Sequence, residues 1–529
     1  MSATASGPLA LRVGNRPEPA WLLAAALLPG LAYLLQGHVG LSLWDEGFLW
    51  YGAQRVLAGE VPLRDFQSYD IGRYYWAAGV MALLGSDGIL AMRVANALLA
   101  AVTVLMVSTL VARHTRHRGA LVGVLVAGTV LLWMTPDFKV ADMFASVCLL
   151  AGLTRLIERP GPERCFAAGI AAGLAAVIGI NHGLYAAIAG GAAGIWLLAR
   201  RALPDAGRSL AAAVAGVAVG YAPMLAALAL VPGFAAAFVD SIAFLFELGA
   251  TNIALPVPRF WAVRFGSGQP PIESLRQLAV GLAFFALPCA ALAGLYASLR
   301  RAVLPDPAAC ALLVASSCLM LPYAHYAFSR ADTVHLAGAA LPFLAAAYAA
   351  SSPWPRAARL AACTALAGAS ALLMLPDQPG YALLRGAPLQ WAQVGGDRLL
   401  VPPERARELA LLHELAQRHA RPGQPFLAAP FWPGAYAVLR RGSPTWEIYG
   451  LFALSEARQR REIERIAQAG IGFAVIDDTW LDGRAALAWR ATHPLIERYL
   501  AGCFARVSTS PQVSSVRIFT DPVGACQAS

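Results

Sequence analysis

Long apolar runs alternate with short polar stretches along most of the chain. Several runs hold about 20 residues without a charged side chain, enough for a helix to cross a hydrocarbon core of about 30 Å. The pattern predicts a polytopic α-helical membrane protein with about eleven transmembrane helices. They are expected at residues 19–37, 89–111, 119–135, 140–157, 165–180, 183–199, 209–231, 276–299, 306–323, 334–351 and 358–375.

The polar stretches between these spans differ in charge. If the N-terminus is cytoplasmic, every stretch on the cytoplasmic side is basic, as the positive-inside rule requires. The arginines concerned are Arg12, Arg16, Arg113, Arg116, Arg118, Arg155, Arg159, Arg164, Arg200, Arg201, Arg208, Arg300, Arg301, Arg356 and Arg359. An odd number of spans then leaves residues 376–529 outside. No small-residue cleavage site follows the first apolar run, so we expect a signal anchor rather than a cleaved signal peptide.

Two long loops lie on the extracytoplasmic side of this topology. Loop 38–88 contains two shorter amphipathic pieces, at 46–58 and 73–85. Loop 232–274 carries prolines that break any continuous helix.

The tail alternates helical and strand patterns. Residues 403–420 and 456–470 have helical periodicity, and short strands are expected at 425–430, 472–478, 503–509 and 515–520. We therefore predict two domains: a transmembrane domain at residues 1–375, which includes the two outer loops, and a small soluble α/β domain at 376–529.

Composition supports the membrane class. Of 529 residues, 58% are hydrophobic and only 14% are charged, whereas a soluble protein carries roughly a quarter charged residues. The eight cysteines show no metal-ligand spacing. Cys503 and Cys526 both belong to the tail, where they either form a disulfide, if the compartment is oxidising, or stay as two free thiols.

Polar residues gather at the outer ends of several predicted spans. Ionisable groups at helix ends within a bundle are costly and usually line a site or a pathway. The groups concerned are Asp45 and Glu46; Asp70 and Arg73; Asp137, Lys139 and Asp142; Asn181 and His182; and His325, Arg330, Asp332 and His335. Acids and bases together, beneath a soluble domain, predict chemistry on a charged lipid headgroup.

Four segments carry a resemblance to a known superfamily. They are "WDEGFLWYGAQRVLAGEVPLRDF", "YDIGRYYW", "DFKVADMF" and "SRADTVHL". With these segments and its C-terminal α/β domain, the chain resembles the GT-C superfamily of polytopic glycosyltransferases. It is most similar to glycosyltransferase family 39, the protein O-mannosyltransferase and aminoarabinose-transferase group.

The resemblance implies an activity and a location. Such enzymes move a sugar from a polyprenyl-phosphate carrier to a glycan, lipid or protein acceptor on the extracytoplasmic face of the inner (plasma) membrane, generally with inversion. The expected partners are therefore the lipid-linked donor, the acceptor and the bilayer, with no nucleic acid.

The carboxylates receive roles from that chemistry. By the family pattern, Asp45 is the candidate base that takes the proton of the acceptor hydroxyl. Glu46 either positions Asp45 or binds the sugar, and the alternative for the pair is a solvated helix end. Asp142, Asp70 and Asp332 are the candidates for holding the acceptor or a sugar hydroxyl.

The cations are candidates for the donor phosphate. Arg73, Lys139, Arg330 and His335 are expected to stabilise the departing phosphate. For Arg73 and Lys139 the alternative is snorkelling toward the interface. His182 is expected to be a satisfied histidine rather than a ligand.

Metal use and a rival function complete the expectations. Asp45, Asp142 and His335 leave a divalent metal possible if they converge, but no local ligand motif supports one, so we predict no cofactor. The rival is a transporter or flippase of a lipid-linked or small substrate, which would keep its charges deep in broken spans. The sequence identifies neither the sugar nor the acceptor.

Overall fold

A computed structural model describes residues 17–250, 252–266, 268–300, 307–507, 513 and 515–522. Arg12, Arg16, Arg301 and Cys526 lie outside these residues, so both alternatives for Cys503 and Cys526, a disulfide or two free thiols, stay expectations. The chain divides into two compact units. The first, here the bundle unit, comprises residues 1–31, 98–223 and 254–378. The second, here the mixed unit, comprises residues 32–97, 224–253 and 379–529.

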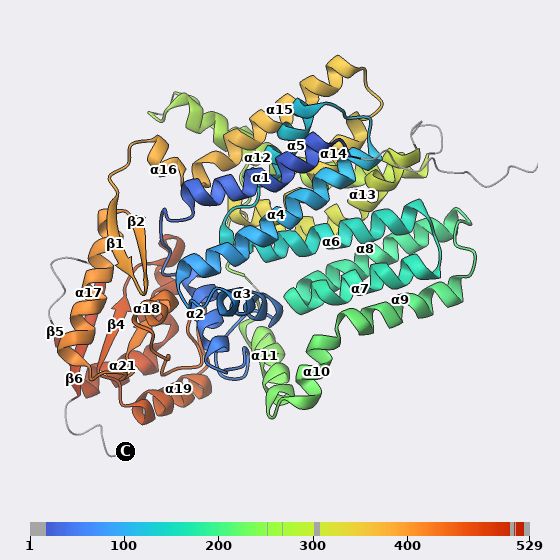
Figure 1. Ribbon diagram of the computed structural model, residues 1–529. Helices are drawn as coiled ribbons and strands as arrows, with labels where there is room; N and C mark the ends of the chain where they lie inside the picture. The colour runs from blue at the N-terminus through green and yellow to red at the C-terminus, as the bar shows by residue number, and fades with distance from the viewer. Residues whose placement is uncertain are drawn as a thin grey trace, which may run out of the picture. The chain divides into compact units, whose positions relative to one another are not determined.

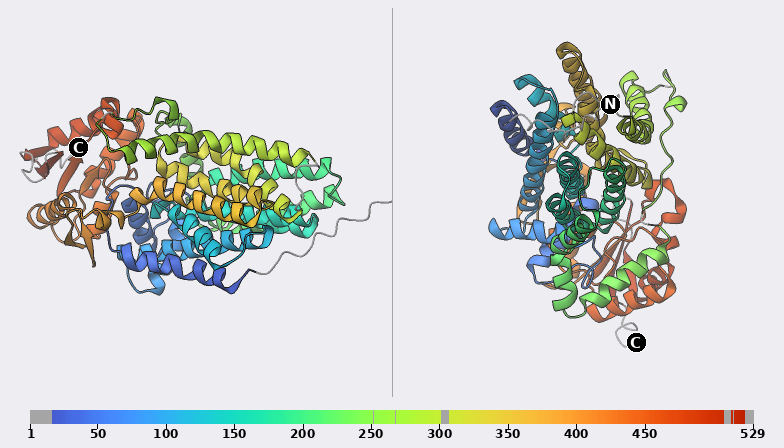
Figure 2. Two further views of the ribbon diagram at one scale, coloured as in Figure 1. Left: turned by 90° about the horizontal axis from the view of Figure 1, so that it is seen from above. Right: turned by 90° about the vertical axis from the view of Figure 1, so that its right-hand side faces the viewer.

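The bundle unit consists of helices that run side by side, as the views of Figures 1 and 2 agree. A continuous core of buried Leu, Val, Ala and aromatic side chains joins them. Its helices are α1 (Pro19–Gln36) and α4 (Ile89–His114), which both continue into the mixed unit, then α5 (Ala120–Leu132), α6 (Val140–Glu158), α7 (Pro162–Ile178), α8 (Ile180–Ala199), α9 (Ala206–Gly220), α12 (Pro271–Leu299), α13 (Pro307–Ser329), α14 (Thr333–Ser351) and α15 (Arg356–Met374).

Each predicted span falls on helix, and the polytopic helical fold is confirmed. In the described part of the chain, eight helices are long and apolar enough to cross a membrane, or nine if α9 and α10 (Ala222–Leu230) form one span. The other two predicted spans fall on α5 and α7, which are apolar helices of 13 and 17 residues and so lie below that length limit. Pro136 closes the apolar run after α5, and Gly179, with an extended backbone, ends α7.

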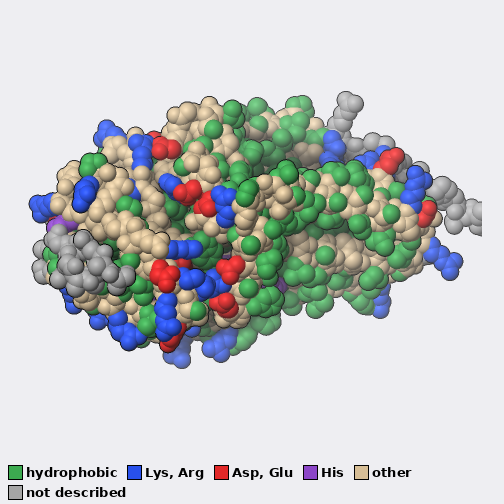
Figure 3. Space-filling model, turned by 90° about the horizontal axis from the view of Figure 1, so that it is seen from below, with side chains coloured by type: hydrophobic (Ala, Val, Ile, Leu, Met, Phe, Trp, Pro, Cys, Tyr) green, Lys and Arg blue, Asp and Glu red, His purple; other side chains and the backbone are tan. Residues whose placement is uncertain are grey.

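The outer flanks of the bundle helices are apolar. On α8, for example, Leu184, Ile188 and Ile195 are 59%, 47% and 71% exposed. Figure 3 shows hydrophobic side chains spread over a broad part of the surface on the face that it presents. A helix that is apolar outside as well as inside is typical of a membrane span.

The mixed unit combines helices with two sheets. A four-stranded sheet has the order β3-β4-β6-β5, with β3 parallel to β4 and the other neighbours antiparallel, and β1 pairs with β2 as a separate hairpin. Its elements are α2 (Asp45–Leu57), α3 (Gly72–Leu83), α11 (Phe234–Leu248), α16 (Tyr381–Leu384), β1 (Gln390–Val394), β2 (Asp397–Val401), α17 (Pro403–His419), β3 (Leu427–Ala429), α18 (Pro433–Leu439), α19 (Glu456–Ala469), β4 (Phe473–Asp477), α20 (Trp489–Thr492), α21 (Pro494–Cys503), β5 (Phe504–Val507) and β6 (Val516–Pro522).

The helices and strands expected in the tail are confirmed. They correspond to α17, α19, β3, β4, β5 and β6, and Gly470 ends α19 in the left-handed conformation, with φ of 58°. The amphipathic pieces of the first loop are α2 and α3. The hairpin β1–β2 was not foreseen, although its two-residue turn, Gly395-Gly396, is a known hairpin signal.

The tail shares its unit with the first outer loop and with residues 232–253 of the second. Val39 bridges to Leu400, and the Trp446 indole donates to the carbonyl of Leu63 at 2.9 Å. Arg458 of α19 binds Asp240 of α11 at 3.0 and 3.1 Å, and it also pairs with Glu247 of the same helix. These contacts give the tail partners in earlier parts of the chain, and the domain boundary at residue 376 stays a prediction.

Candidate functional site

Each unit carries a cluster of buried and half-buried polar side chains at the predicted site residues. The mixed-unit cluster contains Asp45, Glu46, Asp70 and Arg73, and the bundle-unit cluster contains Lys139, Asp142, Arg330, Asp332 and His335. Each cluster is described by itself.

The mixed-unit cluster starts at the first turn of α2. Asp45 and Glu46 are the first two residues of this helix, where unpaired backbone N–H groups favour negative charge. Glu46 is buried and accepts the backbone N–H of Ser42 at 3.1 Å, which ties the helix to the segment before it. Asp45 is half-buried.

Glu46 is held by an arginine that the sequence analysis did not select. Arg93 of α4 donates from Nε to Oε1 of Glu46 at 2.6 Å and from Nη2 to Oε2 at 3.0 Å. It also donates to the carbonyls of Gly37 at 2.7 Å and Gly40 at 2.9 Å. Both side chains are buried, so the fork fixes Glu46 in place and neutralises it.

Asp45 has a different kind of partner. The hydroxyl of Tyr449, from the tail, donates to Asp45 Oδ1 at 3.2 Å. The Tyr449 ring lies 5.5 Å from that of Phe48, which stands one helical turn after Asp45. Glu46 is thus held by a charged arginine fork, whereas the contact that joins Asp45 to the tail is a phenolic hydroxyl.

Arg73 lies on the other side of Phe48. Its guanidinium stands 4.6 Å from the centre of the Tyr69 ring, and Tyr69 packs edge-on against Phe48 at 5.1 Å. Arg73 is 6% exposed, so the snorkelling alternative, which needs a solvated head, does not fit this side chain. Asp70 is half-buried beside Tyr69, just before the start of α3.

Two glycines bring the tail against α2. The backbone N–H of Gly434 donates to the carbonyl of Leu43 at 2.8 Å. A Cβ at Gly47 would come within 2.5 Å of Gly434 backbone atoms, so only glycine fits where α2 and α18 cross. This close packing sets the position of the first turn of α2 relative to the tail.

In the bundle unit, Asp142 of α6 contacts a histidine and a tyrosine. It is 3% exposed, and its Oδ1 lies 2.8 Å from Nε2 of His182, while its Oδ2 accepts the Tyr326 hydroxyl at 3.1 Å. The other ring nitrogen of His182 lies 2.8 Å from the Tyr323 hydroxyl. His182 is therefore satisfied on both sides, as expected, although its role as a partner of Asp142 was not foreseen.

Next to this chain of hydrogen bonds, Asp332 organises two of the predicted phosphate ligands. Its Oδ1 accepts the backbone N–H of His335 at 2.9 Å and lies 2.7 Å from Nδ1 of that residue. Arg330 donates from Nε to its Oδ2 at 2.9 Å. Burial by itself raises the pKa of Asp332, but these contacts lower it overall.

Tyr326 connects the predicted residues of the bundle unit. Its ring lies 5.6 Å from that of His335 and 5.7 Å from the Lys139 ammonium, and its hydroxyl binds Asp142. Lys139 itself is 9% exposed. Asp142, Lys139 and His335 thus meet around one tyrosine, which the sequence analysis did not select.

Metal ligation has no candidate group among the residues that the structure describes. None of their His, Cys, Asp and Glu side chains form a set of three with the spacing that a metal ion needs. The absence of a metal cofactor stays a prediction.

Comparisons with known proteins give distant structural matches. No protein-family profile and no curated protein matches the chain. The crystal structure of ArnT from Cupriavidus metallidurans bound to undecaprenyl phosphate is 14% identical, with a TM-score of 0.48, and the match covers 96% of this chain and 98% of that one. The apo oligosaccharyltransferase from Archaeoglobus fulgidus is 13% identical, with a TM-score of 0.44, over 96% of this chain and 74% of its own.

The arabinofuranosyltransferase AftD from Mycobacteria is 16% identical, with a TM-score of 0.45, over 96% of this chain and 42% of its own. All three proteins are glycosyltransferases of the GT-C superfamily, which the sequence segments resemble. At these identities and TM-scores, none of them assigns a role to a residue of this chain.

Proposed function

We propose that the protein is a membrane glycosyltransferase that moves a sugar from a polyprenyl-phosphate donor to an acceptor hydroxyl on the extracytoplasmic face. The transfer is a single displacement with inversion at the sugar carbon. The acceptor is a glycan, lipid or protein of the cell envelope.

Two adjacent carboxylates with different partners carry this proposal. Glu46 is bound by the buried Arg93 through both oxygens, whereas Asp45 meets the phenolic hydroxyl of Tyr449. A general base must be ionised, must be oriented and must be able to take a proton. Asp45 fits this task, with its charge favoured by the start of α2 and its orientation set by Tyr449. Glu46 then acts as a positioning residue.

A departing lipid phosphate needs positive charge. Arg73 and Lys139 are both buried, and each stands close to an aromatic ring, Tyr69 for Arg73 and Tyr326 for Lys139. Arg330 and His335 already share the carboxylate of Asp332, so a phosphate has to compete for them. All four cations, Arg73, Lys139, Arg330 and His335, remain our candidates for binding the donor phosphate.

Asp70, Asp142 and Asp332 remain the candidates for holding the acceptor or a sugar hydroxyl, and the case for Asp142 is its hydrogen-bonded surroundings. It lies in a network of a histidine and two tyrosines whose hydroxyl and ring protons are exchangeable. Such a network suits the binding of a sugar or acceptor hydroxyl by exchange of hydrogen bonds.

The test is a transfer assay with the full-length protein in liposomes. Polyprenyl-phosphate sugars of several kinds are supplied as donors, with envelope glycans, lipids and proteins as acceptors. We expect release of polyprenyl phosphate together with labelled acceptor, and neither without the acceptor. If the protein instead moves intact donor across the bilayer without cleaving it, it is a flippase and the proposal is wrong.

A further inference from the structure

The bundle unit contains a cavity far from Asp142, a member of the bundle-unit cluster. It has a volume of about 690 Å³ and is lined by residues of α4, α6 and the start of α7. Asp142 stands at the first turn of α6 and Arg155 near its end, so the two are about 20 Å apart at 1.5 Å per residue. The cavity is thus remote from Asp142 and its partners.

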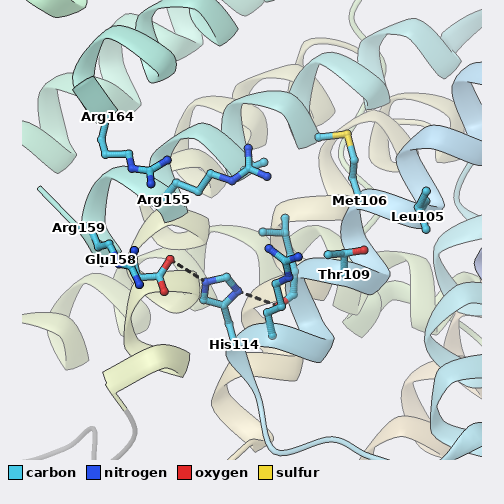
Figure 4. A pocket seen from close by; sticks show the side chains of 11 residues that line it. Leu105, Met106, Thr109, His114, Arg155, Glu158, Arg159 and Arg164 are labelled. Carbon is cyan, nitrogen blue, oxygen red and sulfur yellow. Dashed lines mark hydrogen bonds and ion pairs between the residues drawn. The ribbon is translucent and has the colours of Figure 1, made fainter. Parts of the chain in front are cut away.

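The walls of the cavity are of two kinds. Figure 4 shows Arg159, Arg164 and Glu158 on one side, Leu105, Met106 and Thr109 on the other, and Arg155 reaching between them. A fourth arginine, Arg113, also lines it. A basic mouth joined to an apolar wall fits an amphipathic ligand with an anionic head.

One acidic residue faces the arginines, and it has a partner. Glu158 lies 3.6 Å from Nε2 of the buried His114, whose Nδ1 is 2.9 Å from the carbonyl oxygen of Leu110. Four arginines against one glutamate leave the lining positive at neutral pH even with His114 uncharged. All four arginine side chains are exposed, so they are able to reorient around a ligand.

We propose that this cavity binds a phosphate-bearing lipid. The guanidinium groups of Arg155, Arg159 and Arg164 hold the phosphate through paired N–H donors, and the acyl chain lies along Leu105 and Met106. Basic pockets between transmembrane helices are suited to anionic headgroups for this reason. The ligand is an anionic bilayer phospholipid that stabilises the bundle, and the inference does not depend on the proposed function.

The experiment measures lipid-dependent stabilisation of the purified full-length protein. Phosphatidylglycerol is titrated into detergent-solubilised protein, and the thermal midpoint is followed, since a ligand of the folded state raises it by mass action. Arg155→Gln with Arg164→Gln should weaken the apparent affinity at least tenfold. The matched control, Arg208→Gln with Arg356→Gln, removes two exposed arginines of the same unit outside the cavity and should leave the affinity unchanged.

A second variant tests the apolar wall and guards against misfolding. Leu105 is 36% exposed, so Leu105→Trp fills the cavity without disturbing the core, and it should also weaken the phosphatidylglycerol effect. Equal stabilisation by phosphatidylcholine, or by inorganic phosphate alone, would overturn the proposal. A third outcome is that phosphatidylglycerol has no effect, whereas polyprenyl phosphate binds and the arginine variant weakens that binding. The cavity would then still bind a phosphate-bearing lipid, but this lipid would be the polyprenyl-phosphate carrier.

Discussion

The two polar clusters each contain a buried carboxylate, Glu46 or Asp142, and the two carboxylates have different kinds of partners. In the mixed unit, the buried Glu46 is paired with the positive charge of Arg93. Arg93 also donates hydrogen bonds to the backbone carbonyls of Gly37 and Gly40. In the bundle unit, Asp142 lies 2.8 Å from a ring nitrogen of His182 and accepts the hydroxyl of Tyr326. The Arg93–Glu46 pair fixes the position of Glu46. The network around Asp142 contains hydroxyl and ring protons that are exchangeable.

This difference separates the expected consequences of mutation. Removing a partner from a buried ion pair leaves an uncompensated charge, which costs several kcal/mol of stability. Removing one hydrogen bond from a network such as that around Asp142 lowers the free energy of unfolding by less, and it changes which ligand groups the network binds. Asp45 differs from both carboxylates, because it accepts the Tyr449 hydroxyl and stands at a helix start that favours its charged form.

Asp45→Asn should give the largest effect on activity. The amide keeps the size of the side chain but cannot take a proton at neutral pH, so transfer should fall about 100- to 10,000-fold. Abundance and thermal midpoint should stay at wild-type values. Asp65→Asn, at a partly exposed carboxylate paired with Arg64, is the matched control and should keep full turnover. Wild-type turnover in the Asp45 variant would show that the acidic pair is a hydrated helix end.

Arg93→Met should act on stability rather than on chemistry. It leaves Glu46 buried with no arginine, which should cost about 3–5 kcal/mol of unfolding free energy and much of the folded protein. Adding Glu46→Gln to Arg93→Met should restore part of the thermal midpoint, because the uncompensated charge is gone. If Glu46→Gln by itself abolished turnover in protein that stays fully folded, Glu46 rather than Asp45 would be the base.

Asp142→Asn should have an intermediate effect. Loss of a charge-assisted hydrogen bond, worth about 1.5–3 kcal/mol, should reduce kcat/KM about 10- to 100-fold. Tyr326→Phe removes one hydroxyl from the same network and should give a smaller loss. The split between kcat and KM is the informative readout, because losing a residue that binds the sugar or the acceptor raises KM. A variant with unchanged KM and a lower thermal midpoint would make Asp142 structural.

Local patterns of sequence were enough to locate elements but not to pair their side chains. The spans and the strands of the tail are visible because apolar length and periodicity are properties of neighbouring residues. Asp45 and Glu46 stand out because an acidic pair directly after a span is unusual. Their partners are out of reach, since Arg93 is 47 residues from Glu46 and Tyr449 is 404 residues from Asp45.

Arg93 did carry a signal that was not used. It is the only charged residue within the first 20 residues of an apolar helix, and a lone charge in such a helix usually has a buried partner. Tyr323 and Tyr326 carried none, because tyrosines at the outer ends of spans are most often interfacial. Their contacts with His182 and Asp142 depend on how α13 packs against α6 and α8.

The smallest expected effect concerns Glu462 of α19, which tests whether burial of the arginine partner is what distinguishes the Glu46 pair. It is a buried carboxyl of the mixed unit, like Glu46, but its arginine partner, Arg465, is 46% exposed. It also accepts the backbone N–H of Trp446 at 2.9 Å. Burial raises the pKa of Glu462 to about 7, so an arginine that stays in water does not compensate the charge as Arg93 does for Glu46.

The sign of the pH effect follows from that shift. The folded state binds the Glu462 proton more tightly than the unfolded chain, so the stabilisation is complete below about pH 4.5 and is lost as the pH rises through about 7. The shift sets an upper limit of about 3 kcal/mol, and relaxation around a partly hydrated pair should reduce it to about 1 kcal/mol. Glu462→Gln should therefore shrink the difference in thermal midpoint between pH 5 and pH 8, while Glu464→Gln, a neighbouring exposed carboxylate, should leave it unchanged. An unchanged pH dependence in the Glu462 variant would mean that Arg465 neutralises this carboxylate fully, and burial of the arginine would then not be what distinguishes the Glu46 pair.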